Sequence, residues 1–222
     1  MKIALLGTQP DSINFAPFKD TSWEIWACSP GLINIPRSEV WFDLHYYQEH
    51  YRDGEDDWFA FLAKHPKVYM QRVEPEIPNS VAYPIAEMRA KYGPYFWNSS
   101  LSYMAALAIE AKPDTIGIWG VDMAANGEYA HQRLGCQYFI QKAIDLGIEI
   151  VVPPESDLLE PLPMYGYREA NRRWRKLNAR LNGFKKRHAE LRAARLAQVK
   201  EEALLDGAIE DAEYTLMTFP ND

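Results

Sequence analysis

The sequence has little cysteine, no long apolar run and no cluster of metal ligands, and each absence excludes a class of protein. Only Cys28 and Cys136 occur among 222 residues, which is too few for a disulfide framework and predicts a protein of the reducing cytoplasm. No stretch approaches the roughly 20 apolar residues that a membrane helix needs, so we expect no membrane partner. Because no Cys and His residues have zinc spacing, we predict no metal site.

Basic residues are missing from one end of the chain, since residues 201–222 contain seven acids and no Lys or Arg. Residues 168–200 hold twelve Lys and Arg against two Glu, whereas residues 1–167 hold twelve bases against twenty-two acids. The net charge of −7 therefore hides an acidic body, a basic segment and an acidic tail. This asymmetry predicts two domains, residues 1–167 and 168–222.

Residues 1–167 show an alternation of strand and helix patterns. Strands are expected at Lys2–Leu6, Trp23–Cys28, Glu39–Leu44, Val68–Met70, Thr115–Trp119 and Ile148–Val152. Helices are expected over Tyr46–His65, from Asn98 to Ala111 and over Glu128–Leu146, and Val73–Tyr95 reads as a long connection with a helical piece at Ile85–Lys91. The alternation predicts an α/β fold with a Rossmann-like, mainly parallel sheet flanked by helices.

Residues 168–222 predict a basic helical extension with an acidic tail. One histidine and five apolar residues recur there at intervals of three and four, as in a coiled-coil seam: Trp174, Leu177, Leu181, Phe184, His188 and Leu191. We expect interruptions at Asn182-Gly183 and Asp206-Gly207. The seam predicts a homo-oligomer. Beside the seam runs a basic stripe of Arg168, Arg172, Lys176 and Arg180. Three interpretations of this stripe are open: it contacts nucleic acid, it pairs with a protein surface, or it is solvated.

The first expected strand is followed at once by a turn that carries polar residues. Gly7, Thr8, Gln9 and Ser12 are candidates for holding a phosphate, because backbone amides in a tight turn favour anions. The segment contains one glycine, whereas a dinucleotide fingerprint has three. The alternative is a plain strand-to-helix turn, in which Pro10 sets the bend and Asp11 or Ser12 caps the helix.

Asp43 and His45 lie one residue apart at the end of the third expected strand, which places them on the same face. A histidine beside a carboxylate is a candidate pair for proton transfer. In the alternative interpretation, Asp43 caps the following helix and His45 packs against an aromatic neighbour.

A third group of polar residues follows the strand at Thr115–Trp119. Asp122 emerges just beyond this strand, at the edge where open parallel sheets bind ligands, and is a third catalytic candidate. Arg133 has a planar fork suited to a phosphate or carboxylate. Further ligand-binding candidates surround these two: Asn98, Ser99, Ser100, Glu128, Tyr129 and Gln132. Alternatively, Glu128 and Gln132 are ordinary first-turn helix residues, and Cys136 is expected to be a buried thiol rather than a nucleophile.

Several of these motifs together resemble a protein family of tailed bacteriophages. They include W-F-D-L-H, S-S-L-S-Y-M-A-A-L-A-I, I-G-I-W-G-V-D-M and E-Y-A-H-Q-R, all within residues 1–167. More distantly, the layout is similar to motility-accessory proteins related to 6-hydroxymethylpterin pyrophosphokinase and to bacterial CMP-sialic-acid-dependent sialyltransferases. That likeness implies a Rossmann-like fold with a nucleotide or nucleotide-sugar ligand. The phage family carries no established activity, and Gln9 and Asp11 depart from the G-x-G-P-S loop of the distant relatives.

The sequence therefore predicts a phage-encoded protein of the host cytoplasm that binds a nucleotide or nucleotide sugar, with a group transferase as the enzymatic form of this hypothesis. The alternative is a non-enzymatic accessory protein whose basic C-terminal helix binds nucleic acid or a protein partner. No residue pattern identifies a cofactor.

Overall fold

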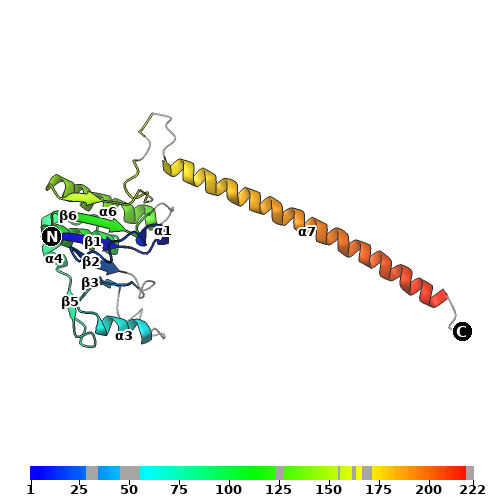
Figure 1. Cartoon of the computed structure of the whole chain (residues 1–222), viewed down its shortest axis with the longest axis horizontal. Helices are drawn as coiled ribbons and strands as arrows, with labels where there is room; N and C mark the ends of the chain where they lie inside the picture. Colours follow the sequence, from blue (N-terminus) through cyan, green and yellow to red (C-terminus); the bar gives the residue numbers. More distant parts are fainter. Residues whose placement is uncertain are drawn as a thin grey trace. The chain divides into compact units, whose positions relative to one another are not determined.

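The structure is a computed structural model that describes residues 1–28, 35–45, 56–123, 128–154, 156–161, 164–166 and 172–218. The side chains of residues 11, 56, 57, 128, 129, 172 and 173 are not described. The chain divides into two compact units, Met1–Pro161 and Leu162–Asp222, which are drawn together in Figure 1 and are described separately below.

The first unit is built on a sheet of seven strands with the order β5-β4-β3-β2-β1-β6-β7. Every pairing in the sheet is parallel. The strands are β1 (Lys2–Leu6), β2 (Trp23–Cys28), β3 (Val40–Phe42), β4 (Val68–Met70), β5 (Ser80–Ala82), β6 (Thr115–Trp119) and β7 (Glu149–Val151). The expected α/β fold with a parallel sheet is thus confirmed.

Helices cover both faces of this sheet. They are α1 (Pro10–Ile13), α3 (Asp56–Lys64), α4 (Ile85–Tyr92), α5 (Ser100–Glu110) and α6 (Glu128–Asp145). Alternate residues of β1 belong to different cores: Ile3 and Leu5 pack with α4, α5 and α6, whereas Ala4 and Leu6 pack with α3. Since β1 is buried on both faces, its sequence is a continuous apolar run.

Four strands coincide with their predicted limits, namely β1, β2, β4 and β6. The connection Val73–Tyr95 contains the expected helix α4 but also β5, which the sequence did not indicate. β5 is a three-residue edge strand that exposes Val81 and Ala82, so it has neither the length nor the apolar content of a recognisable strand.

The second unit contains one long helix, α7 (Arg172–Thr218), of 47 residues. The interruptions expected at Asn182-Gly183 and Asp206-Gly207 are wrong, because both pairs lie inside this continuous helix. A glycine within a helix costs only about 1 kcal/mol relative to alanine, which a long run of good helix formers outweighs. No described helix of either unit is long and apolar enough to cross a membrane.

Candidate functional site

The order of connection in the sheet reverses between β1 and β6, and this position organises the candidate site. The chain runs outward from β1 through β2, β3, β4 and β5, and then returns to place β6 on the other side of β1. Such a switch point leaves a crevice at the carboxyl ends of the two strands, where open parallel sheets bind ligands. The predicted polar turn Gly7–Ser12 and the catalytic candidate Asp122 follow these strand ends.

Gly7 and Gly120 bring the two turns into backbone contact. The Gly7 amide donates to the carbonyl of Trp119 at 2.8 Å, and the Gln9 amide donates to the carbonyl of Gly120 at 2.7 Å. Gly120 has a φ of 67°, and a Cβ at this position would lie 2.6 Å from the Gly7 carbonyl oxygen. A Cβ at Gly7 would in turn collide with the Gly120 carbonyl oxygen. The junction therefore requires glycine on both sides.

Ser12 and Gln9 hold the first turn from within. Ser12 is buried, and its Oγ accepts a hydrogen bond from the Gly120 amide at 2.9 Å. Gln9 Oε1 accepts from the Ser12 amide at 3.1 Å, so Gln9, rather than Asp11 or Ser12, is the N-cap of α1. Thr8 lies between Gly7 and Gln9 and is exposed. Among the four predicted phosphate-binding residues, Ser12 thus supports the junction, whereas Thr8 is accessible to a ligand.

Asp122 and Arg133 hold the segment that follows β7. The amide of Asp157 donates to Asp122 Oδ1 at 2.5 Å. Arg133 is only 4% exposed, and its Nη2 donates to the carbonyls of Asp157 at 2.7 Å and Glu160 at 2.8 Å. The structure thus brings the two predicted ligand groups together through Asp157, with the fork of Arg133 directed at backbone oxygens. Sequence reasoning missed Asp157, because it follows two prolines in a segment whose composition is typical of a linker.

The start of α5 is bound to α6. Ser99 caps α5, because its Oγ accepts from the Ser102 amide at 3.2 Å, which confirms one of the expected caps. Asn98 Nδ2 donates to the carbonyl of His131 on α6 at 2.5 Å. Ser99 Oγ also lies 3.5 Å from Cys136 Sγ. Asn98 and Ser99, which were predicted to bind a ligand, therefore link the start of α5 to α6.

Asp43 and His45 form a hydrogen-bonded pair at the carboxyl end of β3. His45 Nδ1 lies 3.0 Å from Asp43 Oδ1, and Trp58 Nε1 of α3 donates to Asp43 Oδ2 at 3.1 Å. Asp43 is 2% exposed, whereas the side chain of His45 is 44% exposed. Since an ionised carboxylate only accepts hydrogen bonds, Nδ1 carries the proton of the neutral imidazole and Nε2 carries the lone pair. This is the arrangement of a general base that a buried carboxylate orients.

The pair also changes the acidity of the imidazole. The hydrogen bond with Asp43 raises the pKa of His45 above 6.5, although partial burial of the ring acts in the opposite direction. The ring therefore keeps its proton to a higher pH than a solvated histidine does. Trp58 on α3 supplies the donor that helps to fix Asp43.

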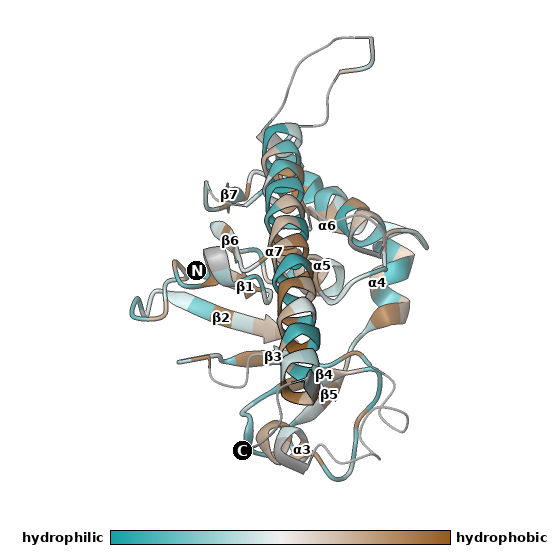
Figure 2. Cartoon of the chain, turned by 90° about the vertical axis from the view of Figure 1, so that its right-hand side faces the viewer, coloured by the Kyte–Doolittle hydropathy of each residue, from teal (hydrophilic) through white to brown (hydrophobic). Residues whose placement is uncertain are grey.

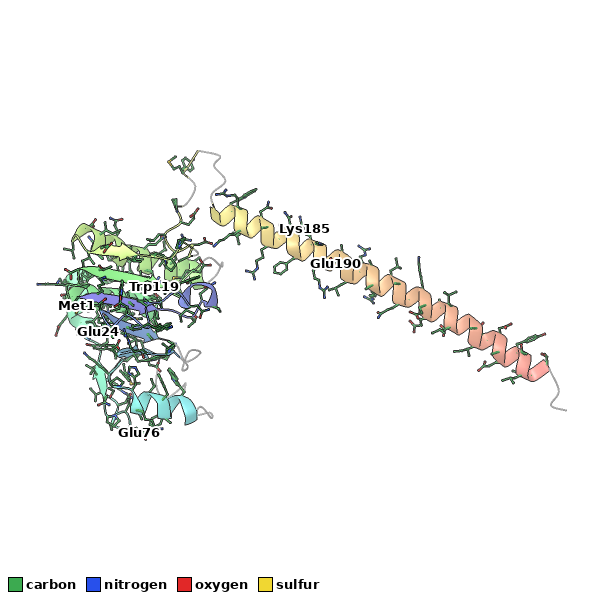
Figure 3. All side chains as sticks on the ribbon, in the orientation of Figure 1. Met1, Glu24, Glu76, Trp119, Lys185 and Glu190 are labelled. Atoms are coloured by element: carbon green, nitrogen blue, oxygen red, sulfur yellow. The ribbon has the colours of Figure 1, made fainter. Side chains whose placement is uncertain are left out.

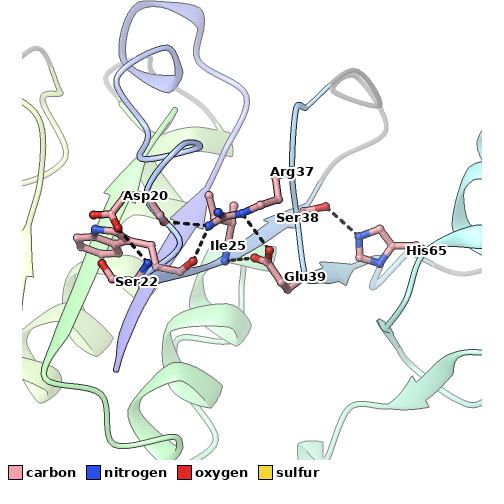
Figure 4. A network of polar contacts seen from close by, with 8 residues as sticks. Asp20, Ser22, Ile25, Arg37, Ser38, Glu39 and His65 are labelled. Atoms are coloured by element: carbon pink, nitrogen blue, oxygen red, sulfur yellow. Dashed lines mark hydrogen bonds and ion pairs between the residues drawn. The ribbon is translucent and has the colours of Figure 1, made fainter.

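A polar network supports β3 from its other end (Figure 4). Arg37 Nε lies 2.9 Å from Glu39 Oε1, and Glu39 Oε2 accepts from the amide of Ile25 on β2 at 2.6 Å. Ser38 Oγ lies 2.8 Å from Nε2 of His65, which follows α3. The start of β3 is thus tied to β2 and to the end of α3, the helix that carries Trp58. Both ends of this short strand are fixed, so Asp43 has a defined position.

The remaining predicted residues differ in where the structure places them. Ser100 is the first residue of α5, and Gln132 is half-buried on α6. The side chains of Glu128 and Tyr129 lie outside the described part. Burial raises the pKa of the Cys136 thiol to about 11, in agreement with its expected role as a buried thiol. Among the described residues, no three His, Cys, Asp or Glu side chains are grouped as metal ligands.

The two parts of the candidate site share one edge of the sheet but are separate. β2 lies between β1 and β3, so Asp43 is about 10 Å from the end of β1 by strand spacing alone. A groove of about 670 Å³ lies elsewhere, lined by residues that precede β6 and β7, such as Pro113 and Gly147, and by Tyr92 and Tyr138. It therefore opens at the amino edge of the sheet, away from every predicted site residue.

No protein-family model and no curated protein sequence matches the chain. Among solved structures it is similar to a thiamine pyrophosphokinase from Bacillus subtilis, with 14% identity and a TM-score of 0.43, over 69% of this chain and 60% of that one. It is also similar to the sialyltransferase CstII from Campylobacter jejuni in complex with cytidine-5'-monophosphate, with 14% identity and a TM-score of 0.47, over 70% of this chain and 80% of that one. A further structure, of CST-II with CMP and a trisaccharide acceptor, gives 12% identity and a TM-score of 0.46. These likenesses concern the fold and identify no function.

Proposed function

We propose that the chain binds a nucleotide or nucleotide sugar at the carboxyl edge of its sheet and transfers a group from it, with His45 as the general base. The observation that carries this proposal is the Asp43–His45 pair, in which a buried carboxylate orients an accessible imidazole. The pair lies on the same edge as the switch point between β1 and β6, the position where parallel sheets bind ligands.

In the proposed step, His45 Nε2 takes the proton of an acceptor hydroxyl. The acceptor oxygen then forms a bond to the transferred group, while the bond from that group to the nucleotide oxygen breaks and the nucleotide leaves with the electron pair. Asp43 stabilises the imidazolium that results, through the 3.0 Å contact with Nδ1. Thr8, exposed beside the switch point, is the candidate contact for the nucleotide.

The origin of the chain in a tailed bacteriophage stays a prediction from the sequence resemblance. It adds no residue to the proposed site and does not enter the step above.

Calorimetric titration with nucleoside phosphates and their sugar derivatives tests the binding. For a sugar derivative that binds, release of the nucleotide is then followed with water or an added hydroxyl compound as acceptor. We expect His45→Ala to retain binding and to slow release by about 10²–10⁴-fold, the usual contribution of a general base. Asp43→Asn should slow it as well, and Asp145→Asn at the far edge of the sheet serves as the matched carboxylate-to-amide control.

Two outcomes contradict the proposal. If no nucleotide or nucleotide sugar produces heat, the chain does not bind this class of ligand. If binding occurs but His45→Ala releases nucleotide as fast as the unchanged chain, the general base lies elsewhere and the assignment of His45 is wrong.

A further inference from the structure

The helix α7 exposes many large apolar side chains along its whole length. In its first half, Trp174, Leu177, Leu181 and Phe184 are each between 44% and 60% exposed. Apolar and polar residues alternate along the helix when it is coloured by hydropathy (Figure 2). A helix of 47 residues is about 70 Å long, and surface with this apolar content marks a contact with another protein.

Eight of the thirteen large apolar residues that α7 exposes follow one heptad pattern through both halves of the helix, whereas Leu196, Val199, Leu204, Tyr214 and Met217 lie outside it. The spacing that joins Trp174, Leu177, Leu181 and Phe184 continues without a shift in register to Leu205, Ile209 and Leu216. Steps of three and four residues keep one stripe facing a partner helix, which is the requirement for a coiled coil. The first half of this stripe is recognisable in the sequence alone, and the second half is hidden by the expected break at Asp206-Gly207.

The stripe is apolar towards both ends of α7, with polar residues between. Two copies of α7 that run in opposite directions overlap along nearly their full length when Leu177 lies level with Leu216 of the second copy. The same alignment places Phe184 level with Ile209 of the second copy, so apolar residues face apolar residues at both ends.

Charge distinguishes the two directions in which such helices can pair. All eleven Lys and Arg of α7 lie between Arg172 and Lys200. All acids of α7 except Glu190 follow Lys200. In this antiparallel alignment, Lys185 and Asp206 of the second copy flank the stripe on the same side and lie within two residues of the same level. The parallel arrangement places Arg180 beside Lys185 of the second copy, and Glu201 beside Asp206 of the second copy, so like charges meet.

The centre of the stripe is polar. Arg195 stands opposite Gln198 of the second copy in this antiparallel alignment, and Glu202 stands opposite Leu191 of the second copy. The charges of Arg195 and Glu202 within the seam lower the stability of the pair. Polar residues at seam positions commonly fix the register of a coiled coil at such a cost, so the centre favours one alignment over shifted ones.

We propose that α7 binds α7 of a second copy of this chain as an antiparallel coiled coil whose midpoint lies between Leu196 and Ala197. Lys185 projects from the helix surface, as Figure 3 shows, and is available for the contact between copies. Arg187 already forms an exposed ion pair with Glu190 at 3.5 Å within the helix, so Lys185 is the clearer probe of pairing. This inference does not depend on the proposed function.

Disulfide cross-linking of the full-length chain tests the direction of pairing. The native Cys28 and Cys136 are buried, so a mild oxidant acts first on introduced thiols. We expect a mixture of Phe184→Cys and Ile209→Cys chains to form a cross-linked dimer, whereas neither variant alone does so. Cross-linking of each variant with itself indicates parallel helices and overturns the proposal.

Sedimentation equilibrium of charge variants tests the same arrangement without cysteines. Lys185→Glu should weaken the dimer roughly tenfold, because two symmetric pairs change from attraction to repulsion. Adding Asp206→Lys to the same chain should restore the original affinity. In a parallel pair, Lys185→Glu would strengthen association instead, since it removes a like-charge contact with Arg180.

The proposal is also overturned if the full-length chain has the mass of a monomer at every concentration. Binding of duplex DNA by a chain that stays monomeric would overturn it as well, and would assign the basic half of α7 to nucleic acid.

Discussion

Two histidines of the first unit lie in contrasting surroundings at the residue scale. His45 is partly exposed and is hydrogen-bonded to the buried carboxylate of Asp43, which raises its pKa above 6.5. His65 is buried between Ser38 and Lys67, and burial lowers its pKa below 6.5. The pKa values of the two histidines are thus shifted in opposite directions. Asp43 favours the charged form of His45, whereas burial disfavours the charged form of His65.

We expect nuclear magnetic resonance titration to show His45 losing its proton at a higher pH than His65. Asp43→Asn should lower the pKa of His45 and leave that of His65 unchanged, and Asp145→Asn should change neither. An unchanged His45 titration in Asp43→Asn would contradict the hydrogen-bonded pair. The raised pKa of His45 stabilises the fold below pH 6.5, and this stabilisation is lost as the pH rises through the folded pKa of His45. The lowered pKa of His65 has the opposite effect, because His65 destabilises the fold as the pH falls from 6.5 through its own folded pKa.

The candidate site shows how far the sequence predicts roles at this scale. Asp43 and His45 were recognisable as a pair, because two residues separated by one position in a strand share a face. The roles of Arg133 and Ser12 were not recognisable, because their partners lie 24 and 108 residues away in the chain. Residue type predicts which bonds a side chain can form, but only the fold determines which bonds it does form.

At the scale of elements, three of the four strands whose limits were predicted correctly lie in the middle of the sheet. β1, β2 and β6 lie in the middle of the sheet, so apolar character and strand limits coincide. β5 was missed because an edge strand needs little apolar surface, and α7 was wrongly interrupted because each glycine was considered apart from its long helical surroundings. Local sequence is therefore a weaker guide at the edge of the sheet and along an isolated helix.

A glycine substitution tests the junction between the turns after β1 and β6, and a second glycine substitution in α7 serves as the comparison. Gly120→Ala should lower the free energy of unfolding of the first unit by about 2 kcal/mol or more, because the new Cβ meets the Gly7 carbonyl and the residue has a positive φ. Gly183→Ala on α7 meets nothing within 4 Å and should instead increase helix stability by about 1 kcal/mol. Urea unfolding of both variants, followed by fluorescence and circular dichroism, provides the comparison, and a stable Gly120→Ala would contradict the close junction.

At the scale of the whole molecule, different interactions stabilise each of the two units. Both apolar cores of the first unit consist of residues up to Leu158, arranged on the two faces of one sheet. In the second unit, every described side chain of α7 from Trp174 onward is exposed. An isolated helix gains little from propensity alone, so we expect a partner to stabilise α7, and the second copy is our proposal for it.

This difference predicts what happens when the chain is ended at Pro161. We expect the shortened protein to fold with an unchanged melting temperature, because none of its buried apolar residues is removed. It should keep any nucleotide binding seen with the full chain, since Thr8, Asp43 and His45 all remain, and it should be monomeric by light scattering. The full-length chain, in contrast, should show a second loss of helical signal whose midpoint rises with protein concentration, as expected for a helix stabilised by association. A shortened chain that fails to fold would show that α7 also stabilises the first unit, and a shortened chain that still dimerises would place the contact between copies outside α7.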